Sequence, residues 1–221
     1  MQESFGGDPV DIALNYGPNA MGTIYKGFHQ TSKKAAEAIK KEGFRLDIPG
    51  ARATDTELPD GVFFKPHSGN IGVGAADPKD ITQIKVKADI SNPLEVLNRQ
   101  EFNRIINDFD PKITSLRREV DAYEKEAVRK FDELEKEYYR PGITIEDSDA
   151  IMDKQDAILK DNEIFAKEKA KDIRERITNA LRDKGYDGVI LTEDVGSFNR
   201  KTETIVTLNP TKITAEEFLD Q

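Results

Sequence analysis

The sequence contains no cysteine, no tryptophan and only two histidines among its 221 residues. The absence of cysteine excludes disulfide bonds, thiolate metal sites and cysteine nucleophiles, and it fits a reducing cytoplasm. No apolar run is long enough to cross a membrane, and residues 1–20 lack the basic start and apolar centre of a signal peptide. We therefore expect a cytoplasmic protein that has no membrane partner.

Basic runs interleaved with aromatic residues are also missing, and the net charge is −9. A general nucleic-acid surface needs a basic stripe that displaces counterions from phosphates, so the composition disfavours this class of protein. Neither His29 nor His67 belongs to a cluster of histidines and carboxylates at ligand spacing, so no metal site is expected. The Gly-x-Ser-x-Gly motif of many hydrolases is absent as well.

The first third of the chain is rich in β-forming residues. After a polar, glycine-containing tail or linker at residues 1–20, short apolar runs occupy residues 23–28 and 61–64. Residues 81–90 alternate apolar and polar side chains, which predicts a half-buried strand. The first run is expected to stop at His29.

A short helix is expected directly after His29. Thr31 and Ser32 are suitable N-cap residues, and Gly43 is a suitable C-terminal stop. The residues between them include three apolar side chains on one helical face: Ala35, Ala36 and Ile39.

The middle of the chain has helical rather than strand periodicity. Apolar residues recur every three or four positions from residue 112 to 139, and a second such pattern runs from residue 151 to Gly185. A Pro-Gly pair at residues 141–142 separates the two patterns. They predict two long amphipathic helices that form a hairpin, with these seam residues buried: Leu116, Val120, Phe131, Leu134, Ile158 and Phe165.

The β signal returns after Gly185. We expect a strand at residues 187–191, a turn at 193–201, a strand at 202–208 and a small terminal helix at 213–218. The fold class is therefore α+β. Residues 21–221 are expected to form one domain, with the helical hairpin inserted at about residues 100–184, and removing the hairpin is expected to leave a folded core.

Three separate segments carry a resemblance to a known family. Residues 28–31 read Phe-His-Gln-Thr, residues 61–64 read Gly-Val-Phe-Phe, and residues 203–206 read Glu-Thr-Ile-Val. In this order they resemble the ADP-ribosyltransferase superfamily, in its His-Tyr-Glu branch. That branch includes toxin-like enzymes. Residues 185–190 and 209–213 further resemble the ADP-ribosyltransferase-like domains of polyvalent proteins from phages and mobile elements. The resemblance implies a split β-sheet core.

The resemblance also implies an activity and its residues. NAD would be the substrate, no metal would be needed, and Glu203 would be the catalytic carboxylate with His29 as its partner at the ribose. The cofactor-binding residues would be His29, Gln30, Thr31, Phe63 and Phe64, with Phe63 packed on the nicotinamide. Gln30 stands where the family has glycine, and Phe63 where it has tyrosine.

Three functions remain open at this stage. The first is a mono-ADP-ribosyltransferase that modifies a macromolecular acceptor, either a protein or a nucleic acid. The second is an NAD glycohydrolase, in which water is the acceptor. The third is a catalytically silent domain of the same fold that serves as a structural or partner-binding module. We expect an enzyme, which could be part of a larger polypeptide.

Overall fold

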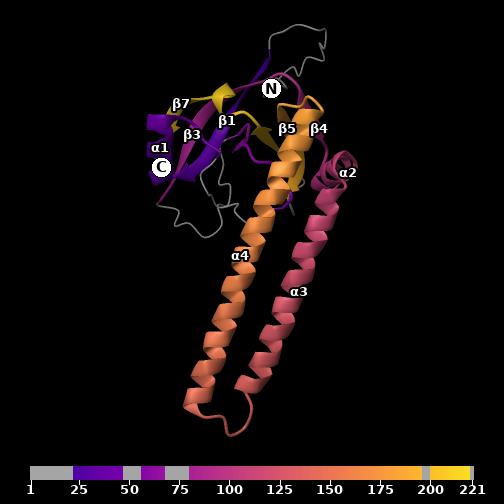
Figure 1. The fold of residues 1–221 in the computed structure, drawn as a ribbon. Helices are drawn as coiled ribbons and strands as arrows, with labels where there is room; N and C mark the ends of the chain where they lie inside the picture. Colours follow the sequence, from indigo (N-terminus) through magenta and orange to yellow (C-terminus); the bar gives the residue numbers. More distant parts are fainter. Residues whose placement is uncertain (1–21, 47–55, 68–79, 196–199, 220–221) are drawn as a thin grey trace, which may run out of the picture.

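The computed structural model describes residues 22–46, 56–67, 80–195 and 200–219. In this part of the chain, seven strands form two sheets, and four α-helices accompany them. Figure 1 shows a mixed head from which two long helices project as an arm. The α+β class expected from the sequence is therefore confirmed, whereas the tail predicted at residues 1–20 lies outside the described residues.

The first sheet has the order β1-β3-β7 and is antiparallel throughout. Its strands are β1 (Thr23–Ser32), β3 (Ile81–Ile90) and β7 (Ile213–Leu219). The alternation in residues 81–90 predicted β3 correctly, and its apolar side chains face a core: Ile84, Val86, Ala88 and Ile90. β1 runs on through His29 to Ser32, so the expected stop at His29 is wrong.

Strand β7 replaces the terminal helix expected at residues 213–218, and that prediction is wrong. β7 pairs with β3 along the sheet edge, with a bulge between Lys85 and Val86, and Lys85 forms an ion pair with Glu217. Ile213 packs in the core cluster below β3. A helix of six residues is not stable alone, so pairing with a neighbouring strand overrides its weak local preference.

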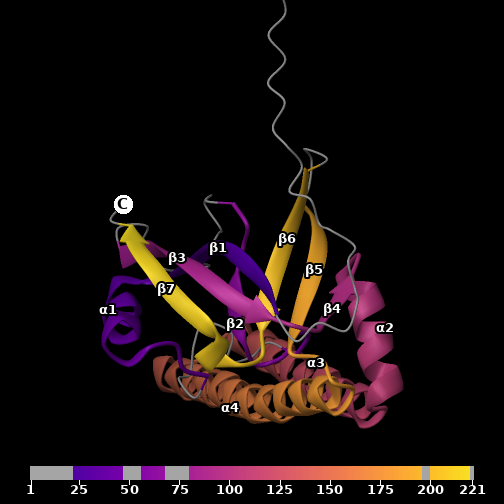
Figure 2. The same cartoon turned by 90° about the horizontal axis from the view of Figure 1, so that it is seen from above.

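The second sheet has the order β2-β6-β5-β4. Its strands are β2 (Val62–Phe64), β4 (Pro93–Val96), β5 (Gly188–Val195) and β6 (Arg200–Thr207), and only the β4–β5 pair is parallel. β5 and β6 are longer than expected and extend into the turn predicted at residues 193–201, of which residues 196–199 lie outside the described residues. The two sheets diverge in the view from above in Figure 2.

Helix α1 (Lys33–Glu42) follows β1 and confirms the predicted capping. The Ser32 hydroxyl accepts a hydrogen bond from the Ala35 amide, and Gly43 ends the helix at a φ of 77°. Glycine adopts this left-handed conformation without the steric cost that a Cβ brings. The helix packs against β1 and β3 through Ala36.

The arm consists of helices α3 (Lys112–Tyr138) and α4 (Ile145–Asp183), preceded by the separate helix α2 (Arg99–Phe109). At 1.5 Å per residue, the 27 residues of α3 span about 40 Å and the 39 residues of α4 about 58 Å. The predicted helical hairpin is confirmed. Gly142 has a φ of 82° in the turn, and Thr144 caps α4 by accepting a hydrogen bond from the Asp147 amide.

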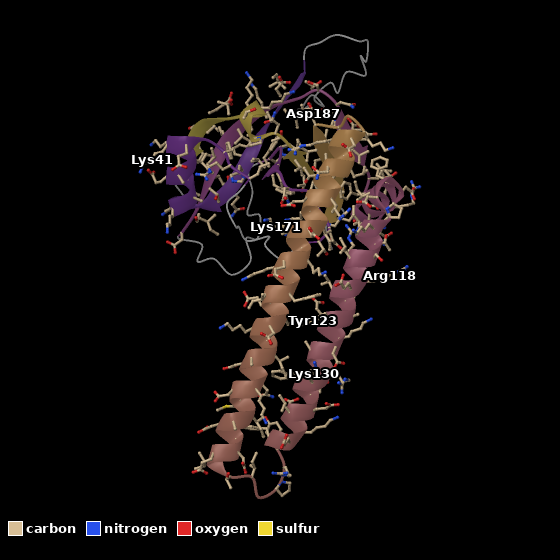
Figure 3. The ribbon with its side chains drawn as sticks, in the orientation of Figure 1. Lys41, Arg118, Tyr123, Lys130, Lys171 and Asp187 are labelled. Atoms are coloured by element: carbon tan, nitrogen blue, oxygen red, sulfur yellow. The ribbon has the colours of Figure 1, made fainter. Side chains whose placement is uncertain are left out.

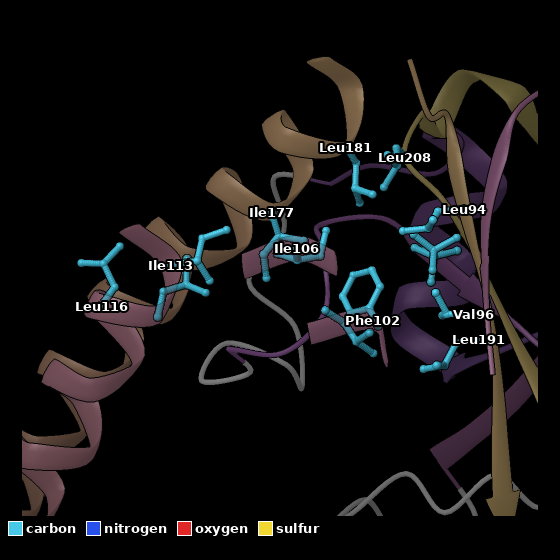
Figure 4. Packing of buried hydrophobic residues seen from close by; sticks show 14 of the residues in the cluster. Leu94, Val96, Phe102, Ile106, Ile113, Leu116, Ile177, Leu181, Leu191 and Leu208 are labelled. Atoms are coloured by element: carbon cyan, nitrogen blue, oxygen red, sulfur yellow. The ribbon is translucent and has the colours of Figure 1, made fainter. Parts of the chain in front are cut away.

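The base of the arm belongs to the core of the head. Figure 4 shows apolar side chains of the helices packed against those of the second sheet and its flanks: Phe102, Ile106, Ile113, Ile177 and Leu181 against Leu94, Val96, Leu191 and Leu208. These contacts bury one face of the second sheet. We therefore now expect removal of the whole hairpin to expose that face to water, against the expectation from the sequence.

The seam of the arm is only partly buried. Leu116 and Val120 are buried, whereas Phe131, Leu134, Ile158 and Phe165 are half-buried, so the predicted burial of the whole seam is wrong. Beyond the sheet each helix has a single neighbour, and a two-helix contact covers its own seam incompletely. Tyr123 and Phe165 stack across the seam with ring centroids 3.9 Å apart.

Candidate functional site

The two sheets meet where β1 passes β2. Phe28 and Lys65 exchange both backbone hydrogen bonds, with N–O distances of 2.7 and 3.1 Å. The approach is close at Gly27, where an added Cβ would lie 2.4 Å from the carbonyl oxygen of Lys65 and 2.7 Å from the ring of Phe64. Only glycine fits here without displacing a backbone.

His29 lies directly beside this crossing. It is opposite Ile84 in the first sheet, is half-buried, and meets the ring of Phe44 edge-on with centroids 5.2 Å apart. Its Nδ1 lies 2.7 Å from the carbonyl oxygen of Phe63 in β2. A carbonyl oxygen can only accept, so Nδ1 carries the hydrogen, and Nε2 of the neutral ring keeps a lone pair.

The same surroundings determine the charge of the ring. Burial lowers the pKa of His29 below its usual value, and the hydrogen bond to the Phe63 carbonyl opposes this effect more weakly. The imidazole is therefore neutral near pH 7. A neutral ring with Nδ1–H fixed offers Nε2 as a hydrogen-bond acceptor, which suits a hydroxyl group.

Glu203 lies in β6, in register with Thr192 of β5. The strand begins at Arg200, two residues earlier than expected, so Glu203 is its fourth residue. The carboxylate side chain is half-buried and shares a strand face with Ile205, which packs in the core cluster between the sheets.

The strand register relates Glu203 to His29. The Phe28–Lys65 bridge puts Phe64 opposite His29, and Phe64 in turn pairs with Ile205, two residues after Glu203. All these positions share one face. In a flat sheet with strands about 4.8 Å apart and a rise of about 3.4 Å per residue, Cα atoms related by this register are about 12 Å apart. A cofactor-sized molecule spans such a distance.

Strand β2 sends its two aromatic rings to opposite faces. Phe64 is 2% exposed and packs in the core with Ile84 and Ile205, whereas the ring of Phe63 packs against the cluster that the helices cover. Phe63 reaches His29 through its carbonyl oxygen. The cofactor contacts implied for both rings stay predictions, and in the structure each ring has a packing role.

Gln30 and Thr31 complete the first segment. Both are half-buried in β1, where Gln30 is opposite Gln83 and Thr31 is opposite Thr82. Thr31 shares the strand face of His29, and Gln30 points to the other face. His67 is exposed after β2.

Contacts that no sequence pattern indicated hold β2 in place. The residues just before it are fixed by helix α4: the Asp60 carboxylate accepts from Arg174 Nε at 2.9 Å, and the Asp60 amide donates to the Thr178 hydroxyl at 2.9 Å. In addition, Arg117 Nε of α3 donates to the Thr56 carbonyl at 2.9 Å. These pairs are more than 60 residues apart in the sequence, so no local pattern could reveal them.

Comparison of the chain with family models, with curated proteins and with solved structures found no match. Within the residues that the structure describes, no group of three or more histidines and carboxylates is placed to hold a metal ion. None of the described helices is long and apolar enough to span a membrane.

Proposed function

We propose that the chain is a mono-ADP-ribosyltransferase that cleaves the nicotinamide–ribose bond of NAD and transfers ADP-ribose to a macromolecular acceptor. The observation that carries the proposal is the strand register, in which His29 and Glu203 share one face, with His29 held neutral and its Nε2 left as an acceptor. These two residues also carry the resemblance to the ADP-ribosyltransferase superfamily.

The proposed roles follow from the charge that develops in the reaction. As the bond between ribose C1′ and nicotinamide breaks, its electron pair leaves with nicotinamide, and positive charge grows on the ribose as in glycoside hydrolysis. The Glu203 carboxylate accepts a hydrogen bond from the ribose 2′-hydroxyl and stabilises that charge electrostatically. His29 Nε2 accepts a hydrogen bond from a hydroxyl of the other ribose. The acceptor nucleophile then forms the new bond to C1′ and loses its proton to water.

A silent ADP-ribosyltransferase-like domain is the second candidate. Two observations favour it: Gln30 brings a side chain to a position where the family has glycine, and the ring of Phe63 packs under the helices. NAD hydrolysis, with water as the acceptor, uses the same residues as transfer, so the site does not separate these two activities.

Incubation of the full chain with NAD labelled in its adenylate half distinguishes the three candidates. Transfer releases nicotinamide and leaves label on protein or nucleic acid, and hydrolysis releases nicotinamide with free ADP-ribose as the only labelled product. A chain that binds NAD without turnover, or fails to bind it, is the silent domain, and this result overturns the proposal.

A further inference from the structure

The end of the arm exposes five large apolar side chains. Their exposed fractions run from 45% for Met152 to 78% for Ile145. We call this set the apolar patch; its members are Val128, Tyr139, Ile145, Met152 and Leu159. Exposed groups of this kind in a folded protein mark interaction sites more often than scattered single residues do.

The members of the patch lie on one face of the hairpin. Ile145, Met152 and Leu159 are seven residues apart and form one stripe along α4, and Val128 and Tyr139 form another along α3 and its C-terminal cap. On each helix, a rotation of about 90° about the helix axis separates the seam from the stripe. On both helices this rotation runs from the seam in the direction in which the chain winds toward its C-terminus. Because α3 and α4 are antiparallel, these directions lead to the same face of the arm.

Carboxylates surround the patch. Val128 has Glu124 and Asp132 four residues on either side, and Tyr139 follows Glu135 by four. Residues three or four apart are neighbours on a helix surface. On α4, two acids stand between the apolar positions at the same spacing: Asp149 and Asp156.

These five carboxylates are exposed and have no ion-pair partner among the described residues. Some other acids of the arm are paired: Arg129 binds Glu126 and Glu133, and its hydrogen bonds lower the pKa of Glu126 to about 2. Lys167 pairs with Glu163 in the same way. Figure 3 shows the density of charged side chains along both helices. The patch is thus apolar and carries uncompensated negative charge.

We infer that the apolar patch binds a basic amphipathic helix of another protein. Its apolar stripes provide contacts for residues at helical spacing, and the five carboxylates match lysines or arginines on the flanks of such a helix. The negative charge disfavours a second copy of this chain, because the same acids would face one another across a symmetric interface. This inference goes beyond the proposed NAD chemistry and does not depend on it.

The test is a direct binding measurement with the full chain and a labelled peptide of leucine and lysine, about five helical turns long, with leucines on one helical face. We expect binding that weakens as salt is raised, because exposed charges are screened. The double variant Met152→Ser/Leu159→Ser should weaken binding about tenfold or more, since it removes two apolar contacts. The charge variant Asp156→Lys should also weaken it.

Matched controls come from the same helix. Ile164 is 48% exposed but lies about 140° round α4 from Leu159, and Asp161 lies equally far from Asp156. Ile164→Ser and Asp161→Lys should leave peptide binding unchanged. A peptide with scrambled leucines, or with glutamate in place of lysine, should bind at least about tenfold more weakly.

Two results overturn the inference. One is equal binding of the ordered and scrambled peptides, or equal loss in the patch variants and their controls. The other is dimerisation of the chain in sedimentation that Met152→Ser/Leu159→Ser abolishes, which would identify a second copy as the occupant. Circular dichroism of each variant checks that the helices are intact.

Discussion

Stability should fall as the pH is lowered from 7.5 to 5.5, and His29 should account for a defined part of this loss. Burial lowers the pKa of His29 in the folded protein, whereas in the unfolded chain the ring titrates near its ordinary value of about 6.5. Below that value the unfolded chain binds a proton that the folded protein does not. The free energy of unfolding therefore decreases as the pH falls toward the folded-state pKa, and it is restored above about pH 7.

The magnitude has a clear limit. If the unfolded chain binds one proton more than the folded protein, the free energy of unfolding changes by about 1.4 kcal/mol per pH unit. Half of this slope is reached at about pH 6.5, so the His29 contribution lost between pH 7.5 and 5.5 is at most about 1.4 kcal/mol. The hydrogen bond to the Phe63 carbonyl also raises the pKa, so the measured loss should lie below this limit.

The assay is urea unfolding followed by circular dichroism at pH 7.5, 6.5 and 5.5. The His29→Gln side chain keeps an N–H that can donate to the Phe63 carbonyl, but it cannot be protonated. The stability of this variant should therefore depend less on pH than that of the parent. The exposed His67 is the only other histidine, and His67→Gln should preserve the parent's profile. Parallel pH profiles for the parent and His29→Gln would refute the reasoning.

Three further changes test other parts of the structure. Gly27→Ala should cost about 1–3 kcal/mol in chemical unfolding, because its Cβ would lie 2.4 Å from the Lys65 carbonyl; an unchanged midpoint would mean that β1 and β2 are not in close contact. Arg174→Ala should lower the free energy of unfolding by about 1.5–3 kcal/mol, because it removes a largely buried charged partner of Asp60. Lys171→Ala loses only an exposed ion pair with Glu175 and should lower it by less than about 0.5 kcal/mol. Equal losses would contradict the role given to Asp60. Replacing residues 125–163 with a short Gly-Ser turn should leave a folded head, because the base of the arm stays in place. Deletion of residues 112–184 should instead cause aggregation. Two equally soluble products would contradict the placement of the core at the base of the arm.

Elements with strong local signals could be predicted from the sequence. The alternation of residues 81–90 predicted β3, the Ser32 and Gly43 caps predicted α1, and the long apolar periodicity predicted α3 and α4. β4 and β7 could not be predicted in this way, because each forms by pairing with a strand from a distant part of the chain.

The candidate site also combines features that the sequence indicates with features that it does not. The sequence predicts roles for His29 and Glu203 because both belong to segments that resemble a family. The partner that fixes the His29 tautomer is a backbone carbonyl, and every residue has one, so the Phe63 contact carries no sequence signal. The opposite directions of Phe63 and Phe64 follow from strand alternation, but which ring enters which core depends on packing by the helices.

The most direct test of the proposed function is the rate of nicotinamide release from NAD by the parent, by Glu203→Gln and by Glu216→Gln. The Glu203→Gln change keeps size and hydrogen bonding but removes the charge that stabilises the ribose in the transition state, so the rate should fall on the order of 10²-fold to 10³-fold. Glu216 is an exposed glutamate in β7, and its variant should match the parent. Release at the parent's rate by Glu203→Gln, or no release by the parent at all, would contradict the account.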